Sequence, residues 1–563
     1  MYRLYVKALN SESSGNAPLN SNRLDNREDL SQNQPATMTE IEACSVDDIQ
    51  DGGMKDIEVD DGKILLVQRG QEYSAVGGKC THYGAPLING SMSNGVVRCP
   101  WHGACYNVQT GDIEDFPGLD SLPTFDVSVK NGKIYIHVPE SGVAKRLKNM
   151  CGSVPENRKT FVLVGGGPAS VVCAETLRQE GFTGRIIIVS KESVLPYDRP
   201  KLSKAMDAKP ESLALRNAEF YKKYDIEIRQ GHEVVSVDTK AKVVRMYDGK
   251  KISYDSLFIA TGGKPRVLPI PGSGLKNVCS LRTPADANFI AEQAKGKDVV
   301  VVGSSFIGLE VTAFLHDKCK SVTVIGTSAT PLQRVFGEKL GRVFQKMHEE
   351  KGVKFYFEKG VKALRGKEDD ILTEVVLSDG TVLSADICIL GVGVVPATDF
   401  LKKSDIELTK RGFVSVNERL QTNIPDVYAG GDIVEFPLFT VPGSKVNIQH
   451  WQMAHQHGKI AGYNMNGISR EIKSVPYFWT VMYGKSVRYT GYGPGYDDVI
   501  VHGDLDVPKF AAFYTKGDNV VAVASLAFDP IVSQAANLML QGEVIQKSEI
   551  MSDPKTWVGR LKP

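Results

Sequence analysis

Two different hydrophobic patterns divide the chain. Residues 38–139 contain short segments in which apolar and polar positions alternate, bounded by Gly, Asp or Asn. Such segments predict β-strands, here at 64–67, 72–76, 95–98 and 133–138. From residue 159 the apolar residues form continuous runs that lead into glycine turns and helical patterns, which is typical of buried parallel strands. We therefore predict an all-β unit followed by a larger α/β unit.

Two of the continuous apolar runs lead into glycine turns that open predicted helices. Phe161-Val162-Leu163-Val164 is followed by Gly165-Gly166-Gly167-Pro168, and Val299-Val300-Val301-Val302 is followed by a second turn that starts at Gly303. Strand, glycine turn and helix form the dinucleotide-binding fingerprint, in which the pyrophosphate lies against the helix N-terminus. Two such sites in one chain predict FAD in the first and NAD(P)H in the second.

The residues that follow the second strand of each unit indicate how the ribose is bound. After the strand at 185–190, Lys191 occupies the usual position of an acid and Glu192 comes one residue later. Glu192 is therefore predicted to bind the adenosine ribose. After Ser321-Val322-Thr323-Val324-Ile325, neither an acid nor an arginine occupies the selective position, which leaves NADH and NADPH open.

Length, charge and cysteine content narrow the class of protein. The 563 residues are too many for one core, and a net charge of +1 gives no indication of nucleic-acid binding. No apolar run reaches the ~18 residues of a transmembrane helix. Nine scattered cysteines are not a secreted disulfide framework, so we expect an intracellular protein of the cytoplasm or the mitochondrion. Residues 1–37 are predicted to be a disordered tail, with a mitochondrial targeting peptide as the alternative.

Two loops within the all-β unit have metal-ligand spacing. Cys80-Thr81-His82 and Cys99-Pro100-Trp101-His102 each supply one thiolate and one imidazole. Four such ligands suit a tetrahedral zinc ion or a Rieske [2Fe–2S] centre, in which two histidines replace two cysteines on one iron.

The residues around these ligands resemble the Rieske signature. A glycine follows each ligand pair, at Gly84 and Gly103, and Pro86 and Pro100 stiffen the two loops. The resemblance implies a [2Fe–2S] cluster whose ligands are Cys80, His82, Cys99 and His102.

The Rieske resemblance also carries an expectation about the reduction potential. High-potential Rieske proteins have a serine at the position of Ala104 and a disulfide between the positions of Ala85 and Trp101, whereas Tyr106 keeps a second hydroxyl donor. Hydrogen-bond donors to the cluster sulfurs stabilise the reduced cluster. The missing donor therefore implies a low potential.

The remainder of the chain resembles flavoprotein reductases with two dinucleotide sites. Ala260-Thr261-Gly262-Gly263, Gly391-Val392-Gly393 and Tyr428-Ala429-Gly430-Gly431-Asp432 occur in the order seen in that superfamily. Leu195-Pro196-Tyr197-Asp198-Arg199-Pro200 is similar to the branch of apoptosis-inducing factors and oxygenase-coupled ferredoxin reductases. The implied fold is multi-domain: an all-β Rieske domain, an α/β reductase with two dinucleotide-binding domains, and a C-terminal α+β domain.

Domain boundaries follow from these motifs and from the shifts in composition between them. We expect a Rieske [2Fe–2S] domain at 38–139, a linker at 140–158, an FAD-binding domain at 159–290 and 401–471, an NAD(P)H-binding domain at 291–400, and a C-terminal reductase interface domain at 472–563.

The resemblance also implies the site residues. For FAD they are Gly165, Gly167, Pro168, Ala169, Glu192, Arg199, Lys204, Thr261, Gly262, Asp432, His450, Trp451 and Trp479. For the nicotinamide nucleotide they are Gly303, Ser305, Ile307, Gly308, Gly391 and Gly393. Lys204, Glu310 and Phe306 are expected beside the reacting rings, with Glu310 paired to Lys204. His455 and His457 are expected on different sides of a solvated helix rather than at a metal.

The cysteine pattern indicates where electrons leave the flavin. Disulfide reductases carry a redox dithiol near the flavin, but Cys173 is the single cysteine of the corresponding helix region. The expected route is a hydride from NAD(P)H to FAD, then single electrons to the cluster and to an unknown one-electron acceptor protein. A redox-gated signalling protein is the alternative, and no 2-His-1-carboxylate site is visible for a complete oxygenase. Monomer and homodimer both remain open.

Overall fold

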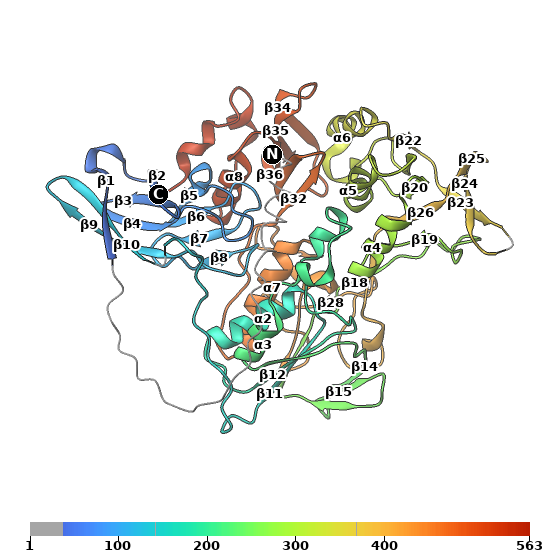
Figure 1. Cartoon of the computed structure of the whole chain (residues 1–563), viewed down its shortest axis with the longest axis horizontal. Helices are drawn as coiled ribbons and strands as arrows, with labels where there is room; N and C mark the ends of the chain where they lie inside the picture. The colour runs from blue at the N-terminus through green and yellow to red at the C-terminus, as the bar shows by residue number, and fades with distance from the viewer. Residues whose placement is uncertain (1–37, 141, 368, 563) are drawn as a thin grey trace, which may run out of the picture.

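The computed structural model describes residues 38–140, 142–367 and 369–562. The predicted disordered tail at 1–37 lies outside these residues. Figure 1 shows an N-terminal β domain, two α/β domains and a C-terminal domain that lies between the N-terminal domain and the second α/β domain. The predicted fold class is thereby confirmed.

The N-terminal domain consists of two antiparallel sheets. The larger has the order β1-β10-β9-β4-β3-β2, formed by β1 (Met38–Ser45), β2 (Met54–Val59), β3 (Gly62–Arg69), β4 (Glu72–Gly77), β9 (Thr124–Lys130) and β10 (Lys133–Pro139). The smaller is formed by β5 (Ser91–Ser93), β6 (Val96–Arg98), β7 (Cys105–Asn107) and β8 (Ile113–Asp115).

Strand β3 separates two cores within this domain. Leu65 and Val67 belong to the core that contains the two ligand cysteines, whereas Ile64 and Leu66 belong to a core on the opposite face. Because successive side chains of a strand point to opposite faces, a run of four apolar residues fills both cores at once.

The first α/β domain has a parallel sheet with the order β13-β12-β11-β17-β29. Its strands are β11 (Thr160–Val164), β12 (Arg185–Val189), β13 (Ile226–Arg229), β17 (Ser256–Ile259) and β29 (Val427–Ala429). Helices α2 (Pro168–Gln179) and α7 (Trp451–Met465) pack against each other. A side chain at Gly458 of α7 would lie 2.2 Å from the Ala169 carbonyl oxygen, so only glycine permits this close helix contact.

The second α/β domain is inserted between β17 and β29. Its parallel sheet has the order β19-β26-β20-β21-β22, with β19 (Val278–Cys279), β20 (Asp298–Val302), β21 (Ser321–Ile325), β22 (Lys354–Tyr356) and β26 (Ile387–Leu390). Its helices include α4 (Pro284–Gln293), α5 (Phe306–Leu315) and α6 (Gln333–Glu349).

Short elements complete the two α/β domains. They are α3 (Ala218–Lys223), the sheet of β14 (Val234–Asp238), β15 (Val243–Met246) and β16 (Lys251–Ser253), the pair β18 (Gly263–Pro265) and β27 (Val394–Pro396), the sheet of β23 (Val361–Gly366), β24 (Leu372–Leu377) and β25 (Val382–Ser384), and the sheet of β28 (Val414–Ser415), β30 (Val434–Pro437) and β31 (Lys445–Val446).

The C-terminal domain is a five-stranded antiparallel sheet covered by one helix. The sheet order is β32-β33-β36-β35-β34, with β32 (Tyr477–Met482), β33 (Lys485–Gly491), β34 (Asp498–Asp504), β35 (Lys509–Lys516), β36 (Asn519–Leu526) and α8 (Ile531–Leu540). Helix α8 contacts β5, and β32 contacts α5. Across the described ranges, no helix is long and apolar enough to cross a membrane.

A buried carboxylate joins the N-terminal domain to the first α/β domain. Asp115 ends β8 and is 5% exposed. Arg98, which is fully buried, lies 3.3 Å from one carboxylate oxygen. Gln452 and Gln456 of α7 donate hydrogen bonds of 2.8 and 2.6 Å to the other oxygen. Asp115 is therefore a main contact between the N-terminal domain and α7.

Helix α8 fastens the same domain from the other side. Asn537 accepts a 2.7 Å hydrogen bond from Arg98 Nε, and Ser533 donates a 3.0 Å hydrogen bond to the carbonyl of Cys99. These contacts reach the ligand loop itself, so the position of the loop depends on the C-terminal domain.

Asp115→Ala is expected to reduce the stability of this interface strongly, because it leaves the Arg98 cation buried without its carboxylate. The loss of one partner from a buried ion pair costs about 3–5 kcal/mol. The effect is measured by heating the protein and recording the temperature at which the visible absorbance of the predicted [2Fe–2S] cluster is lost. Glu40→Ala, which removes the exposed Lys130–Glu40 pair of the same domain, is the control and should leave that temperature nearly unchanged.

Candidate functional site

The four predicted ligands lie together at one end of the N-terminal domain. Cys80, Cys99 and His102 are buried, at 3%, 0% and 3% exposure, and His82 is half-buried. The Nδ1 atoms of His82 and His102 lie 3.1 Å apart. The two thiols also face each other through a hydrogen bond. Burial and this hydrogen bond raise the pKa of Cys99, whereas for Cys80 burial raises the pKa and the same hydrogen bond lowers it.

The two ligand loops have the same backbone geometry. In the first, the Cys80 amide donates to the Ala85 carbonyl at 2.9 Å, and in the second the Cys99 amide donates to the Ala104 carbonyl at 2.7 Å. Gly84 and Gly103, each four residues after its cysteine, have φ of 73° and 81°. This left-handed conformation favours glycine, which explains why a glycine follows each ligand pair in the sequence.

The protonation states of the imidazoles suit metal binding. Burial lowers the pKa of His82 to about 3, and burial together with the neighbouring His82 lowers the pKa of His102 well below its usual value. Both rings are therefore neutral near pH 7, which is the form that ligates a metal.

The arrangement fits two irons better than one zinc ion. A zinc site brings four donors to one point, but among the residues that the structure describes no three His, Cys, Asp or Glu side chains converge in this way. A facing thiol pair and a facing imidazole pair, by contrast, supply two ligands to each iron of a Rieske centre. The donor set fits a [2Fe–2S] cluster.

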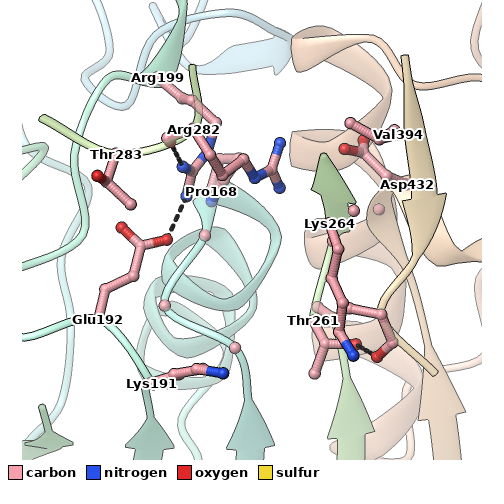
Figure 2. A pocket seen from close by; sticks show the side chains of 18 of the residues that line it. Pro168, Lys191, Glu192, Arg199, Thr261, Lys264, Arg282, Thr283, Val394 and Asp432 are labelled. Atoms are coloured by element: carbon pink, nitrogen blue, oxygen red, sulfur yellow. Dashed lines mark hydrogen bonds and ion pairs between the residues drawn. The ribbon is translucent and has the colours of Figure 1, made fainter. Parts of the chain in front are cut away.

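A cavity of about 1290 Å³ lies between the two α/β domains and the C-terminal domain. Every residue predicted for FAD lines it, and so do the three residues expected beside the reacting rings. Figure 2 shows part of this cavity, with Pro168 at the N-terminus of α2 on one side and Asp432 on the other.

The first glycine turn forms one end of the cavity. Added side chains at Gly165 would lie 2.2 Å from the Ala260 carbonyl oxygen, whereas Gly167 has no protein atom within 4 Å of the corresponding position. Gly165 is therefore needed for the turn, and Gly167 borders open space at the N-terminus of α2, where a pyrophosphate is expected.

Glu192 points into the cavity, as Figure 2 shows. Its Oε1 lies 2.9 Å from Arg199 Nη2. Its Oε2 is buried and has no hydrogen-bond partner in the described part of the chain. Lys191, by contrast, pairs with the exposed Glu233. An orphaned buried carboxylate oxygen fits a ribose hydroxyl, so Glu192 remains our candidate for this role.

The second glycine turn does not reach the cavity wall. Gly303, Gly308 and Gly391 pack against one another: a side chain at Gly303 would meet the Gly391 carbonyl at 2.3 Å, and one at Gly308 would meet the Gly303 carbonyl at 2.1 Å. Gly393, with φ of 89°, and Ser305, the N-cap of α5, complete the predicted set. From α5, only Phe306, Ile307 and Glu310 line the cavity.

The predicted pair of Lys204 and Glu310 is present. Lys204 Nζ lies 2.7 Å from Glu310 Oε2, and Thr480 donates a 2.7 Å hydrogen bond to Glu310 Oε1. Ser203 Oγ also donates to Oε2, at 2.5 Å. Glu310 is 4% exposed, so this ion pair is fixed in the cavity wall with both oxygens hydrogen-bonded.

Two further polar groups line the cavity. His450, the N-cap residue of α7, has a buried Nδ1 with no partner within the described ranges, and burial lowers its pKa to about 4. Burial raises the pKa of the Asp432 carboxyl, opposed by Arg282 and Arg199. A cavity with orphaned buried polar atoms at both ends fits a long cofactor with polar groups such as FAD.

Trp479 belongs to both sites. It lines the cavity, and its ring centroid lies 4.3 Å from that of His102 and 5.8 Å from that of His82. One aromatic side chain of the C-terminal domain therefore separates the ligand histidines from the cavity.

The expectation of a solvated helix for His455 and His457 is wrong. Both rings are buried, at 1% and 0% exposure. His455 stacks on Phe116 of the N-terminal domain with a centroid distance of 5.1 Å, and His457 Nδ1 accepts a 3.0 Å hydrogen bond from the Gly431 amide. Helix α7 is covered on both sides, so its polar residues contact protein rather than water.

The sequence did not reveal the role of two residues that the structure brings to these sites. Arg282 lines the cavity, and its carbonyl accepts hydrogen bonds from Tyr197 and Arg199. Its only sequence signal is its position before the capping box that starts at Thr283. Tyr83 stacks on His82 at 3.8 Å and donates a 2.5 Å hydrogen bond to Asp198.

Comparison with protein families gives three matches that together cover most of the chain. Residues 159–458 match the family described as pyridine nucleotide-disulphide oxidoreductase. Residues 39–126 match the Rieske [2Fe-2S] domain, and residues 477–561 match the reductase C-terminal domain.

Individual relatives agree with these matches. Apoptosis-inducing factor 3 of Homo sapiens is 48% identical over 92% of this chain and 86% of its own length. Rhodocoxin reductase of Rhodococcus erythropolis is 34% identical over 65% of this chain and 86% of its own length. The crystal structure of the covalent putidaredoxin reductase–putidaredoxin complex aligns with a TM-score of 0.66 and 30% identity, covering 68% of this chain and 94% of the other.

Gly167→Glu is expected to abolish flavin binding without unfolding the protein, because the new side chain enters the open space beside α2 rather than a packed contact. Ile307→Glu, at a cavity residue that is 47% exposed, should keep flavin but weaken its reduction by NAD(P)H. Flavin absorbance of the purified variants and its bleaching by NAD(P)H measure both effects. Equal flavin loss from two folded variants would contradict the assignment.

Tyr106→Phe is expected to lower the reduction potential of the cluster, and Ala104→Ser to raise it. The Tyr106 hydroxyl lies 3.2 Å from Cys80 Sγ, where it can donate, and Ala104 is fully buried beside the second loop. We expect the unmodified protein near the low end of the Rieske range, on the order of −150 mV. Redox titration followed by EPR measures the three values. A midpoint well above zero in the unmodified protein would refute this expectation.

Proposed function

We propose that this chain, which belongs to the pyridine nucleotide-disulphide oxidoreductase family and carries a Rieske [2Fe–2S] domain, passes electrons from its flavin to its own cluster. The protein is an NAD(P)H-dependent flavoprotein oxidoreductase with FAD and [2Fe–2S] cofactors. The proposal concerns the internal electron route and the acceptor.

The observation that carries the proposal is the position of Trp479. Its ring contacts His102 at 4.3 Å and forms part of the flavin cavity wall. The rate of electron transfer falls steeply with distance, so a single aromatic layer between two redox centres favours direct transfer between them.

The docked arrangement removes the need for a diffusional encounter. Tyr83 binds Asp198 of the flavin domain, and Ser533 binds the carbonyl of Cys99. Both contacts hold the ligand loops in place against the cavity. Because the two centres are held in one chain, each transfer is intramolecular and does not depend on protein concentration.

The residues around the cavity suit the required change from two-electron to one-electron chemistry. FAD held in this cavity would supply the chemistry that converts a two-electron hydride donor into a source of single electrons. Lys204, held by Glu310 at 2.7 Å, places a cation where it would stabilise the negative charge of a reduced flavin. Phe306, the first residue of α5, packs on Phe478 with a centroid distance of 4.9 Å and lines the cavity.

The relatives support an iron–sulfur partner. One solved structure that aligns over 68% of this chain is the covalent putidaredoxin reductase–putidaredoxin complex, and two further relatives are named as ferredoxin reductases. In our proposal the Rieske domain takes the place of such a separate partner, within the same chain.

The acceptor that follows the cluster is proposed to be a one-electron acceptor protein that approaches the first ligand loop. His102 is 3% exposed, whereas His82 and Tyr83 are half-buried and Gly84 is exposed. The surface beside His82 is therefore the more accessible side of the cluster.

Trp479→Leu is expected to slow reduction of the cluster by NAD(P)H by about tenfold or more, which corresponds to a barrier increase of ~1.4 kcal/mol. Flavin reduction, the preceding phase, should slow much less. Stopped-flow absorbance separates the two phases. Trp451→Leu is the matched control, since Trp451 lines the same cavity but its ring lies against His455, at 5.0 Å. Equal cluster reduction rates in both variants would exclude the proposed route.

A further inference from the structure

Among the described residues, several cationic side chains near the cluster ligands are largely buried; Arg98, Lys204 and Arg488 are three of them. Arg98 is fully buried beside Cys99, and Lys204 is 10% exposed at the cavity. Each faces a buried carboxylate: Asp115, at 7% side-chain exposure, and Glu310, at 4%. The charges of these two cations are therefore largely compensated within the protein. The third cation is Arg488, which has no role in the binding sites described above.

Strand pairing places Arg488 on the side of the cluster. Arg488 lies in β33 directly opposite Trp479 in β32. Side chains that are opposite each other in an antiparallel pair project from the same face of the sheet. The Trp479 ring contacts His102 at 4.3 Å, so Arg488 shares the face that meets the ligand histidines.

The charge of Arg488 is compensated less well than that of the other two cations. Its partner is Asp529, 3.1 Å away, whose side chain is 30% exposed and thus screened by water. Arg488 itself is 6% exposed, and its Nε is buried without a hydrogen-bond partner in the described part of the chain. A buried, incompletely paired cation is costly, so its position beside the cluster calls for an explanation.

The charge of a Rieske cluster changes in a way that such a cation can sense. Two ferric ions, two sulfides and two thiolates sum to zero, and one added electron makes the cluster singly negative. A nearby cation therefore stabilises the reduced cluster and has little effect on the oxidised one. We propose that Arg488 raises the reduction potential of the cluster and so favours electron transfer from the flavin. This inference rests on the proposed function for its purpose, but its test does not.

A second side chain of β32 agrees with this placement. Tyr477, two residues before Trp479 in β32, has its ring against Gly103, the residue after His102. Because residues i and i+2 of a strand lie on the same face, Arg488 shares its sheet face with two side chains that lie against the second ligand loop.

Arg488→Gln is expected to lower the midpoint potential of the cluster, with a roughly tenfold change in its reduction equilibrium, or about 59 mV for one electron. Arg488→Lys keeps the charge and should restore most of the loss. Asp529→Asn removes the opposing charge and should shift the midpoint in the other direction. The measurement is an equilibrium titration with dithionite and mediators, followed by the EPR signal of the reduced cluster in the full-length holoprotein. Arg342→Gln, at a residue of α6 whose side chain is 62% exposed, is the control.

Midpoint potentials that shift in opposite directions in Arg488→Gln and Asp529→Asn support the proposal. A general loosening of the interface would shift the two midpoint potentials in the same direction. An unchanged midpoint in Arg488→Gln with the cluster intact would overturn it. If that variant fails to retain its cluster, Asp529→Asn decides, and a midpoint that does not rise overturns the proposal. In this titration dithionite and the mediators reduce the cluster, so the result does not depend on NAD(P)H or on electron transfer from the flavin. A shifted midpoint in a protein whose cluster NAD(P)H does not reduce would therefore refute only the electron route.

Discussion

The placement of both redox sites depends on the buried carboxylate of Asp115. This carboxylate forms an ion pair with Arg98 and accepts hydrogen bonds from the side-chain amides of Gln452 and Gln456. The two glutamines lie on α7, whose N-cap residue His450 lines the cavity. One helix therefore carries a cavity residue at its N-terminus and the attachment of the N-terminal domain within its first two turns. A rotation of this domain about α7 would separate Asp115 from both glutamines and would also break the hydrogen bond of Arg98 to Asn537 on α8.

The polar character of this interface favours precise orientation over maximal stability. A buried ion pair gives little net stability, because the desolvation of its charges offsets their attraction. Hydrogen bonds at fixed distances, in contrast, define one orientation among many that an apolar surface would allow. The proposed electron transfer requires a defined distance between two centres, and the contact of Trp479 with His102 depends on the orientation of the domain. A polar interface is therefore well matched to this task.

The parts of the structure with local causes were predictable from the sequence. Cys80, His82, Cys99 and His102 share loops closed by short hydrogen bonds, and the positive φ of Gly84 and Gly103 needs glycine at those positions. The fold class follows similarly from strand and turn patterns. Glu192 could be placed in the cavity because its strand and its turn are both local.

Contacts between distant segments were not predictable in the same way. Tyr83 and Asp198 are 115 residues apart, and Arg98 and Asn537 are 439 apart; no periodicity in the sequence connects such pairs. The misplacement of His455 has the same cause. A helix with polar residues on several faces predicts exposure to water, yet here the second covering surface is itself polar. Where two domains meet through polar groups, hydrophobic periodicity no longer separates the inside from the outside, and only the three-dimensional arrangement distinguishes them.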